Sequence, residues 1–294
     1  MLCRSQLTVC AVFKNEATNL HEWLSFHDLM GVQKFILYND DSSDNFMEIL
    51  QPWIDSKKLT LRSSYSRHLN RARAQKEIYN HCLNRERLLS KWIAFIDLDE
   101  FLFSPKGLPL PIVLRQFRKF PAVLVRWFLF GSGGNAHKDP DTPVIERYLM
   151  CQGVGQATLD SFEHGSRSDD SNYVTGWSRC GKSIVNPLRV WEMGIHLPQG
   201  KARSLTIEED YKPHRWRSVP GTPFSADVLR INHYWSKSIE ELTKKIDRGA
   251  LSKIGRPKRN LAKALRREEG LNNVYDDTIL RVRDGMLSRA TREH

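Results

Sequence analysis

Short apolar runs alternate with longer amphipathic segments along the first hundred residues of the chain. Four of these runs have the composition of strands buried on both faces, and they cover residues 7–13, 34–38, 59–62 and 92–96. Three segments between them carry apolar residues at helical spacing, over residues 16–30, around 46–50 and over 71–88. This alternation predicts an α/β fold, with a mostly parallel sheet, right-handed crossovers and helices on both faces. The ligand of such a sheet is expected beyond the carboxyl ends of its strands.

The second half of the chain has a less regular pattern. Further strands are expected over residues 122–130, 182–185, 188–191 and 229–235. A long polar loop at residues 137–178 is expected to contain one short helix at 144–150. The strand before that loop ends in four residues, 131–134, of which three are glycine. This run is either a flexible turn or a loop that makes room for a substrate.

The composition is that of a soluble globular protein, with 40% hydrophobic and 10% aromatic residues. No apolar run approaches the roughly 20 residues that cross a bilayer. The 294 residues can bury one large core, so we expect one α/β domain over residues 1–243 and a basic helical extension over 244–294. The helix that leads into this extension is predicted over 238–248, with Ser238 as N-cap and Glu241 at the capping-box position.

The formal net charge of +11 is concentrated at the C-terminus. Residues 244–294 contain fourteen Lys or Arg and seven Asp or Glu, so they contribute +7 and the preceding residues only +4. Such an extension is either a solvated helical face or a surface that attracts an anionic membrane or a polyanionic acceptor. A nucleic-acid partner is not expected, because the basic residues are not spread over the whole chain.

The five cysteines are scattered, odd in number and never arranged as Cys-x-x-Cys. This spacing argues against a disulfide framework and a zinc site, and it favours a reducing compartment. The residues before the first predicted strand are too few to hold a signal peptide. We therefore expect a cytoplasmic protein, or one held at the inner membrane face by its basic extension.

Three carboxylates follow the fourth apolar run: Asp97, Asp99 and Glu100. In an extended chain, side chains at i and i+2 share a face, so Asp97 and Asp99 are expected to point together and Glu100 away from them. Two carboxylates on one face repel each other unless a cation lies between them. Oxygen ligands select a hard divalent ion such as Mg²⁺ or Mn²⁺. The alternative is an ordinary solvated acidic turn.

Polar residues also follow the first two predicted strands. They are Asn15, Glu16, Asp40 and Asp41. Because the carboxyl ends of parallel strands meet at one edge of a sheet, these residues should lie near the acids that follow the fourth strand. Ser43 or Asp44 is a candidate N-cap for a helix, whereas Asp40 and Asp41 exceed any capping need.

Four motifs lie at or near these strand ends. They are Phe13-Lys14-Asn15-Glu16, Asn39-Asp40-Asp41-Ser42-Ser43-Asp44, Asp97-Leu98-Asp99-Glu100-Phe101, and Asn232-His233-Tyr234 with Lys237-Ser238. Together they resemble glycosyltransferase family 92 and related family 2-like glycosyltransferases, over roughly residues 7–249. The resemblance implies the GT-A fold, a Rossmann-like mixed sheet flanked by helices. It also implies hexosyl transfer from a nucleotide-diphosphate sugar, expected to be a UDP-sugar, to a glycan or glycolipid acceptor in polysaccharide biosynthesis.

By the same resemblance, Asp97 and Asp99 form the Asp-x-Asp element that holds a divalent metal, Mn²⁺ or Mg²⁺, against the donor diphosphate. His233 is then the third metal ligand, although a histidine on a strand is also a common structural residue. The remaining donor contacts are expected from Asn15, Glu16, Asp40, Asp41, Arg71, Gln75 and Asp97.

Transfer with inversion needs a carboxylate that takes the proton of the acceptor hydroxyl. The candidates are Glu192, Asp139, Asp169 and Asp170. A buried position beside Trp191 would make the Glu192 carboxylate more basic. The Glu-Asp pair of many family 2 enzymes is absent at this stage of the chain, so the resemblance does not choose among these four. Trp127, Trp177, Trp191 and Trp216 offer flat faces to sugar rings, although most tryptophans are core residues.

Two other classes of protein are compatible with parts of this pattern. A metal-dependent nucleotidyltransferase or phosphoesterase also uses Asp-x-Asp, but a glycine-rich phosphate loop or a denser acidic cluster would be expected there. A non-catalytic protein that binds carbohydrate or polyanions would use the basic extension as its contact surface. Manganese-dependent binding of a UDP-sugar is expected only from the glycosyltransferase.

Overall fold

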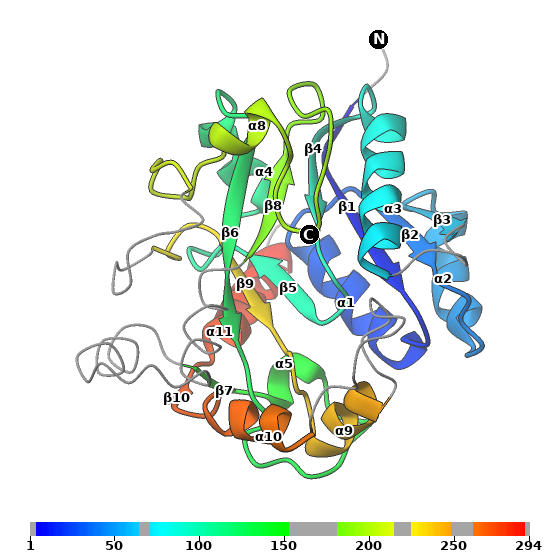
Figure 1. Cartoon of the computed structure of the whole chain (residues 1–294), viewed down its shortest axis with the longest axis vertical. Coiled ribbons are helices and arrows are strands. Elements are labelled where there is room, and N and C mark those ends of the chain that lie inside the picture. Colours follow the sequence, from blue (N-terminus) through cyan, green and yellow to red (C-terminus); the bar gives the residue numbers. More distant parts are fainter. Residues whose placement is uncertain (1–3, 65–70, 153–180, 215–224, 248–260, 292–294) are drawn as a thin grey trace.

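The computed structural model describes residues 4–64, 71–152, 181–214, 225–247 and 261–291. Within these residues an eight-stranded sheet runs in the order β3-β2-β1-β4-β8-β6-β9-β5 (Figure 1). Four neighbouring pairs are parallel, and the three that involve β8 or β5 are antiparallel. The prediction of a mixed, mostly parallel sheet flanked by helices is therefore confirmed.

The first half of the chain folds as its apolar pattern predicts. The strands are β1 (Ser5–Phe13), β2 (Lys34–Asn39), β3 (Leu59–Ser63) and β4 (Ser90–Phe95), and the helices are α1 (Ala17–Leu29), α2 (Phe46–Asp55) and α3 (Arg71–Glu86). All four strands are parallel, so their carboxyl ends lie at one edge of the sheet. At the end of α1, Gly31 has a φ of +91°, and a Cβ there would lie 2.9 Å from Pro111 Cδ. Glycine is the residue that ends the helix here without a clash.

The second half supplies the antiparallel strands and several short elements. They are β5 (Glu100–Phe103), α4 (Leu110–Val113), the 3₁₀ helix η1 (Leu114–Phe117), β6 (Ala122–Leu129), α5 (Val144–Arg147), β7 (Met150–Cys151), β8 (Gly181–Val185), α8 (Lys201–Ser204) and β9 (Arg230–His233). At the contact of β6 with β8, a Cβ on Gly181 would lie only 2.0 Å from the Val125 carbonyl oxygen. Glycine at this position lets the two strands approach each other.

Two of the predictions for this half are wrong. Residues 188–191 form a turn rather than a strand, because Pro187 follows β8 and the Asn186 side-chain oxygen accepts a hydrogen bond from the Leu188 amide at 3.0 Å. The helix expected at 144–150 ends at Arg147, since Met150 pairs with Tyr275 in the short ladder of β7 and β10 (Val274–Tyr275).

The two faces of the sheet carry separate apolar clusters. Residues of α1, α2, α4 and the C-terminal helices pack on one face, and residues of α3 pack on the other (Figure 1). Alternation along β4 shows the division, because Trp92 and Ala94 belong to the first cluster and Ile93 and Phe95 to the second. Burial on both faces explains why these strands read as continuous apolar runs.

Three helices follow β9: α9 (Ile239–Asp247), α10 (Leu261–Glu269) and α11 (Thr278–Ala290). The predicted capping box is present, because the Glu241 amide donates to Ser238 Oγ at 3.1 Å and the Ser238 amide donates to the Glu241 carboxylate at 3.3 Å. Leu271 and Ile279 are fully buried in the larger apolar cluster. Basic residues of this segment also make contacts within the chain: Arg267 lies over the Trp235 ring and Arg283 pairs with Glu146.

Among the residues that the structure describes, no helix combines the length and the apolar character that crossing a membrane requires.

Candidate functional site

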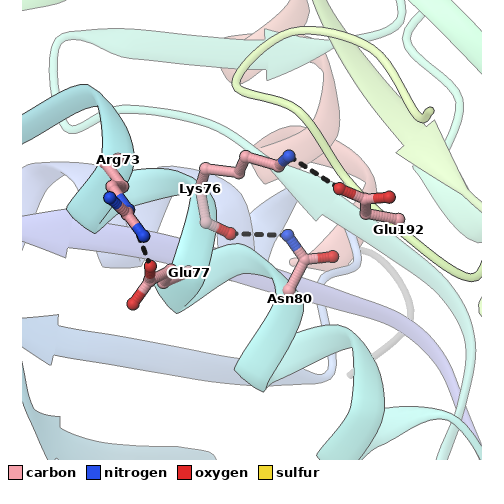
Figure 2. Close-up of a pocket in the computed structure, with 5 residues that line it drawn as sticks. All are labelled: Arg73, Lys76, Glu77, Asn80 and Glu192. Carbon is pink, nitrogen blue, oxygen red and sulfur yellow. Dashed lines mark hydrogen bonds and ion pairs between the residues drawn. The ribbon is translucent and has the colours of Figure 1, made fainter.

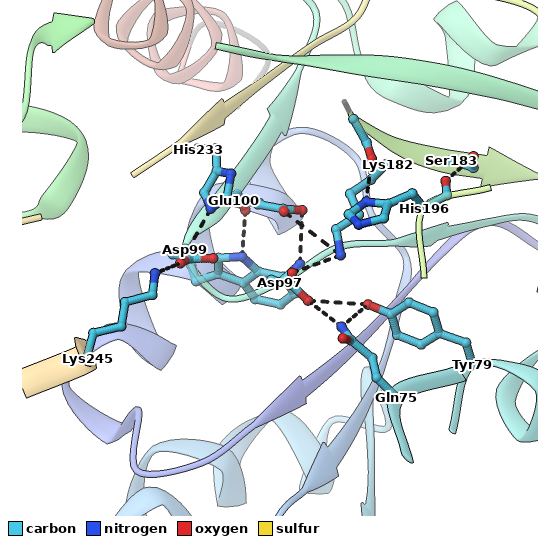
Figure 3. Close-up of polar contacts among 12 residues, drawn as sticks. Gln75, Tyr79, Asp97, Asp99, Glu100, Lys182, Ser183, His196, His233 and Lys245 are labelled. Carbon is cyan, nitrogen blue, oxygen red and sulfur yellow. Dashed lines mark hydrogen bonds and ion pairs between the residues drawn. The ribbon is translucent and has the colours of Figure 1, made fainter. Parts of the chain in front are cut away.

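The acidic segment after β4 is a tight turn rather than an extended strand end. The Glu100 amide donates to the Asp97 carbonyl oxygen at 3.1 Å, and β5 begins at Glu100. The Glu100 carboxylate in turn accepts a hydrogen bond from the Asp97 amide at 3.1 Å (Figure 3). The expectation that Glu100 points away from its neighbours is therefore wrong, because i and i+2 geometry does not apply across a turn.

Sheet register brings Glu100 to a histidine from a distant part of the chain. Glu100 on β5 lies directly opposite His233 on the antiparallel strand β9, and side chains opposite each other share a face. The Tyr234 amide also donates to the Asp99 carbonyl oxygen at 2.8 Å. One ligand atom each of Asp99, Glu100 and His233 consequently lies within 4.8 Å of the other two.

Asp97 belongs to a different set of contacts. Its Oδ2 lies 2.8 Å from the Lys182 ammonium, and its Oδ1 accepts hydrogen bonds from Gln75 at 2.8 Å and Tyr79 at 3.3 Å (Figure 3). Lys182 comes from β8 and its side chain is only 1% exposed. Both carboxylate oxygens of Asp97 thus have partners from α3 and β8, whereas Asp99 lies with Glu100 and His233.

The charges of these acids differ as a result. Burial is the largest single influence and would raise the pKa of Asp97, but the charge of Lys182 and the hydrogen bond that it donates, together with His233, hold that pKa below its usual value. Burial also opposes ionisation of Asp99, but Lys245 and then His233 bring its pKa well below the usual range. Burial raises the pKa of Glu100 well above its usual value; Lys182 only partly opposes this, and the two aspartates add to it. Glu100 is the acid that lacks a sufficient counter-charge.

His233 and His196, which lies beside Lys182 with its Nδ1 3.1 Å from the Gly181 carbonyl oxygen, are both neutral near pH 7. Burial lowers the pKa of His233, although Asp99 opposes the shift. Burial, and next the Lys182 cation, lower the pKa of His196 to about 4. A neutral imidazole keeps a lone pair, which is the form that binds a metal.

The set formed by Asp99, Glu100 and His233 suits a divalent cation. Within the described part of the chain, Glu100 Oε1 and His233 Nδ1 are buried and have no hydrogen-bond partner. A buried polar atom without a partner is costly, and a cation would remove that cost for the carboxylate. Two carboxylates with one imidazole form an oxygen-rich donor set for Mn²⁺ or Mg²⁺.

The ends of β1 and β2 meet as the parallel register predicts. The Asn15 amide donates to Ser42 Oγ at 3.0 Å, and the Asn15 side-chain oxygen accepts from the Ser43 amide at 2.8 Å. Asn15 and Asp41 both have positive φ, 53° and 60°, in turns that such residues enter at some cost. The Asp40 amide donates to the Phe13 carbonyl oxygen, and this bond fixes the start of the turn that follows β2.

The helix cap in this region serves a different helix from the one expected. The N-cap of α2 is Asn45, which makes no side-chain capping bond. Asp44 instead accepts a hydrogen bond from the Ala17 amide at 2.8 Å, at the first turn of α1. A carboxylate at a helix N-terminus is stabilising on either helix, and the parallel pairing of β1 with β2 brings the α1 terminus within reach.

Two more lysines approach the acids from the segment after β9. The Lys245 ammonium lies 3.0 Å from Asp99 Oδ2 and donates to the Trp235 carbonyl oxygen at 2.9 Å (Figure 3). Lys237 is held at a φ of 51°, with its ammonium 3.7 Å from Glu16. Glu16 also accepts a hydrogen bond from the Asn19 side chain at 2.6 Å.

Glu192 lines a cavity of about 660 Å³ beside α3, together with Arg73, Lys76, Glu77 and Asn80 (Figure 2). Its carboxylate pairs with the Lys76 ammonium at 2.6 Å. The expected burial beside Trp191 is absent, because the side chain of Glu192 is 54% exposed and Trp191 is 76% exposed. Pro187 turns this segment out of the sheet, so neither residue reaches the core.

Asp139 is tied into its own loop. It accepts hydrogen bonds from the Asp141 amide at 2.9 Å and the Thr142 hydroxyl at 2.6 Å, and it pairs with Arg147 at 2.9 Å. The bond from Thr142, followed by the one from Asp141, lowers the pKa of Asp139. A less basic carboxylate is a weaker proton acceptor, so this environment does not favour Asp139 as a base.

The remaining sequence candidates fall outside what the structure describes or inside the core. Asp169, Asp170, Trp177 and Trp216 lie outside the described residues, as does the side chain of Arg71. Trp127 is buried on β6, with its ring edge against His233 at a centroid distance of 4.6 Å. Of the four tryptophans considered as sugar platforms, Trp127 is therefore a core residue.

Sequence reasoning missed Lys182, Tyr79 and Lys245. A lysine inside a predicted buried strand is the available signal for Lys182, since such a charge requires a buried partner. No comparable signal marks Tyr79 or Lys245, because a helical tyrosine and a lysine in a basic segment are ordinary residues. Their roles depend on contacts made across 18 and 146 positions of the chain.

Comparison with curated proteins finds relatives that match part of the chain. The glycosyltransferase family 92 protein RCOM_0530710 of Ricinus communis is 33% identical over 106 residues, which are 36% of this chain and 18% of that protein. The galactan beta-1,4-galactosyltransferase GALS2 of Arabidopsis thaliana is 29% identical over 185 residues, 61% of this chain and 33% of that protein. The chain thus spans about a fifth to a third of the length of these relatives.

Comparison with solved structures finds chains of low sequence identity. S. aureus TarS 1-349 has a TM-score of 0.40 and 12% sequence identity, over 89% of this chain and 71% of that chain. Glucosyl-3-phosphoglycerate synthase from Mycobacterium tuberculosis, in complex with Mn²⁺, UDP and glucosyl-3-phosphoglycerate, has a TM-score of 0.32 and 14% identity, over 62% of this chain and 57% of that chain.

The family model described as glycosyltransferase family 92 matches residues 5–215, which include most of the sheet and all of the acidic turn. The resemblance stated from the four motifs is confirmed, and this chain belongs to glycosyltransferase family 92.

Proposed function

We propose that the protein is a metal-dependent glycosyltransferase that moves a sugar from a nucleotide-diphosphate sugar, a UDP-sugar, to a hydroxyl group of a glycan. The observation that carries this proposal is the convergence of Asp99, Glu100 and His233 at the edge of the sheet, in a chain of family 92. Galactose is the first donor sugar to test, because several curated relatives are named galactan beta-1,4-galactosyltransferases.

Asp99, Glu100 and His233 would hold the divalent metal. When bound, such a metal neutralises the negative charge that builds up on the diphosphate as the sugar leaves. Asp97, which has its own partners, would act beside the metal rather than as a ligand, facing the ribose or the diphosphate. This assignment differs from the pair of Asp97 and Asp99 that the Asp-x-Asp pattern implies.

The base and the ribose would be recognised at the ends of β1 and β2. Asn15, Glu16, Asp40 and Asp41 are the candidates, because their strands end at the same edge as β4. Carboxylates and side-chain amides there can bind ribose hydroxyls and the uracil N–H. Gln75 and Arg71 on α3 complete the set, with Gln75 acting through its bond to Asp97.

Transfer with inversion needs a base on the acceptor side, and among the candidates that the structure describes we assign this role to Glu192. It lines the cavity beside α3, where Lys76 is its partner, while the neighbouring Gln75 contacts Asp97. An acceptor hydroxyl that enters this cavity would meet the Glu192 carboxylate. Asp139 and Asp170 are the alternatives.

A turnover assay tests the proposal. The protein is incubated with UDP-galactose, a β-1,4-galacto-oligosaccharide and MnCl₂, and release of UDP is followed together with the length of the glycan. We expect transfer that EDTA abolishes and that Asp99→Asn lowers at least about a hundredfold, a typical loss when transition-state charge stabilisation is removed. Asp284→Asn, on the exposed side of α11, is the matched control. Transfer that persists in EDTA or in Asp99→Asn would refute the metal-dependent mechanism.

A further inference from the structure

Lys245 is the counter-ion of Asp99, a carboxylate that we assign as a metal ligand. Its ammonium lies 3.0 Å from Asp99 Oδ2, and its only other hydrogen bond among the described residues is to the Trp235 carbonyl oxygen. The side chain is 32% exposed and belongs to the last turn of α9. A lysine in such a position can leave one carboxylate and reach a new anion without any movement of the sheet.

An ammonium group and a divalent cation repel each other when they share one carboxylate. The ion pair of Lys245 with Asp99 is therefore favourable in the metal-free protein and is weakened when a divalent cation binds Asp99. We propose that Lys245 exchanges partners: it neutralises Asp99 in the metal-free protein and binds the diphosphate of the donor once a divalent cation has taken Asp99. This inference rests on the proposed function, because it names the part of the donor that Lys245 would bind.

The balance of charge around the site supports the exchange. The acids and lysines that form ion pairs at this edge of the sheet are Asp97, Asp99, Glu100, Glu16, Lys182, Lys237 and Lys245. The three ammonium groups balance three of the four carboxyl groups, so a divalent cation gives the site a net positive charge whether Glu100 is protonated or ionised. A positively charged site attracts a diphosphate. The Lys245 ammonium, released from Asp99, is then a mobile cation close to it.

The three lysines of the site differ in how far their side chains are buried. Lys182 is buried and bound to Asp97, and Lys237 is nearly buried beside Glu16. Lys245 is the most exposed of the three. The exchange is accordingly assigned to Lys245 and not to its two neighbours.

Two titrations on the full chain test the proposal. MnCl₂ is titrated alone into wild type and Lys245→Met, and UDP is then titrated into each protein saturated with Mn²⁺. We expect Lys245→Met to bind Mn²⁺ about two- to fivefold more tightly, because a partly exposed competing ion pair is lost. We expect the same variant to bind UDP at least about tenfold more weakly, because a charged hydrogen bond to phosphate is lost. The opposite signs distinguish an exchange from a structural role, which would weaken both.

Two variants complete the design. Lys244→Met removes the neighbouring lysine, which is 68% exposed and pairs with Glu240, and it should leave both affinities unchanged. Lys245→Arg keeps the positive charge and should restore most of the affinity for UDP. UDP affinity in Lys245→Met within about threefold of wild type, or a fall in its Mn²⁺ affinity, would overturn the exchange. Wild-type protein that binds Mn²⁺ but no UDP would instead contradict the proposed function and remove the ligand that Lys245 is meant to receive.

Discussion

Lys182 separates the roles of the two aspartates in the acidic turn. It is buried and its ammonium lies 2.8 Å from Asp97 Oδ2 and 4.0 Å from Glu100 Oε1. Asp97→Asn would leave the lysine with a partial counter-charge from Glu100, so we expect a loss of about 3 kcal/mol in the free energy of unfolding. Urea unfolding of Asp97→Asn, Lys182→Met and the double variant measures this. The double variant should recover part of the loss, and an Asp97→Asn protein as stable as wild type would contradict the pairing.

Asp97 is a poor position for a test of activity. A loss of activity in Asp97→Asn would mix a loss of stability with any loss of function. Asp99 is the better position, since its partners Lys245 and His233 do not leave a fully buried cation behind when the carboxylate is replaced. For this reason the activity test uses Asp99→Asn.

Glu192 is the residue on which the account of the acceptor side depends. If its carboxylate takes the proton of the acceptor, Glu192→Gln should lower kcat by about a hundredfold or more and leave the KM for the donor nearly unchanged. Glu77→Gln, in the same cavity wall, is the matched control. Steady-state kinetics with a galacto-oligosaccharide acceptor gives both constants. Equal losses in the two variants would point to an effect on the cavity rather than on a base.

His27 makes the stability of the fold depend on pH. Its Nε2 accepts a hydrogen bond from the Leu102 amide at 3.0 Å, so the proton is on Nδ1, which lies 2.8 Å from the Trp23 carbonyl oxygen. Burial lowers the pKa of His27 to about 3, against about 6.5 in an unfolded chain. Between these values the unfolded chain binds more protons, so stability falls as the pH falls.

The slope from this one residue is about 1.4 kcal/mol per pH unit below pH 6.5. Urea unfolding at pH 7 and pH 5 should show a loss of stability in wild type that is about 2 kcal/mol greater than in His27→Gln. His27→Gln is expected to be less stable at pH 7, because glutamine cannot satisfy both backbone groups. If the free energy of unfolding fell by the same amount from pH 7 to pH 5 in both proteins, His27 would not be the titrating group.

Among the elements, the turn after β6 is held by the C-terminal segment. The Ser132 amide donates to Glu268 and the Gly133 amide donates to the Asn272 side chain, both at 2.7 Å. A Cβ on Gly131 would lie 2.3 Å from Asn272 Oδ1, so glycine is needed for this contact. The glycine-rich run is therefore tied to the segment after α10, next to the strand that carries His233.

Removing this contact gives a prediction at the scale of the element. Asn272→Ala should cost about 1 kcal/mol of stability and speed hydrogen exchange of the amides around Gly133, because one protected amide loses its acceptor. Asn273→Ala is the control, since among the described residues its side chain donates to the carbonyl oxygen of Gly270 in its own turn. Unchanged exchange in Asn272→Ala would mean that the loop is held by other contacts.

The elements also show what the sequence could predict. The strands of the first half are buried on both faces, and their apolar runs alone locate them, together with the acids at their ends. The sequence pattern did not predict β5, because the four residues of this strand follow the acidic turn directly and resemble a continuation of it. The pairing of Glu100 with His233, and of Asp97 with Lys182, depends on the register of strands far apart in the chain, which no local pattern contains.

For the whole molecule, the C-terminal segment is part of the packed structure. The proposed boundary at residue 243 falls within α9, and α11 packs against α1. Truncation after Asp247 would expose the apolar residues that Leu271 and Ile279 cover. We expect the truncated chain to lose cooperative thermal unfolding and to bind a hydrophobic dye. Cooperative unfolding near the wild-type midpoint would instead support residues 1–243 as an independent domain with a separate extension.

The assignment of the metal to Asp99, Glu100 and His233 is the central claim for the whole molecule, and calorimetric titration with MnCl₂ tests it most directly. Wild-type protein is predicted to bind one Mn²⁺ ion saturably, Asp99→Asn and Glu100→Gln to lose that binding, and Asp284→Asn to retain it. Binding of Mn²⁺ with the wild-type affinity in Asp99→Asn, or the absence of any saturable binding in wild type, would contradict the account.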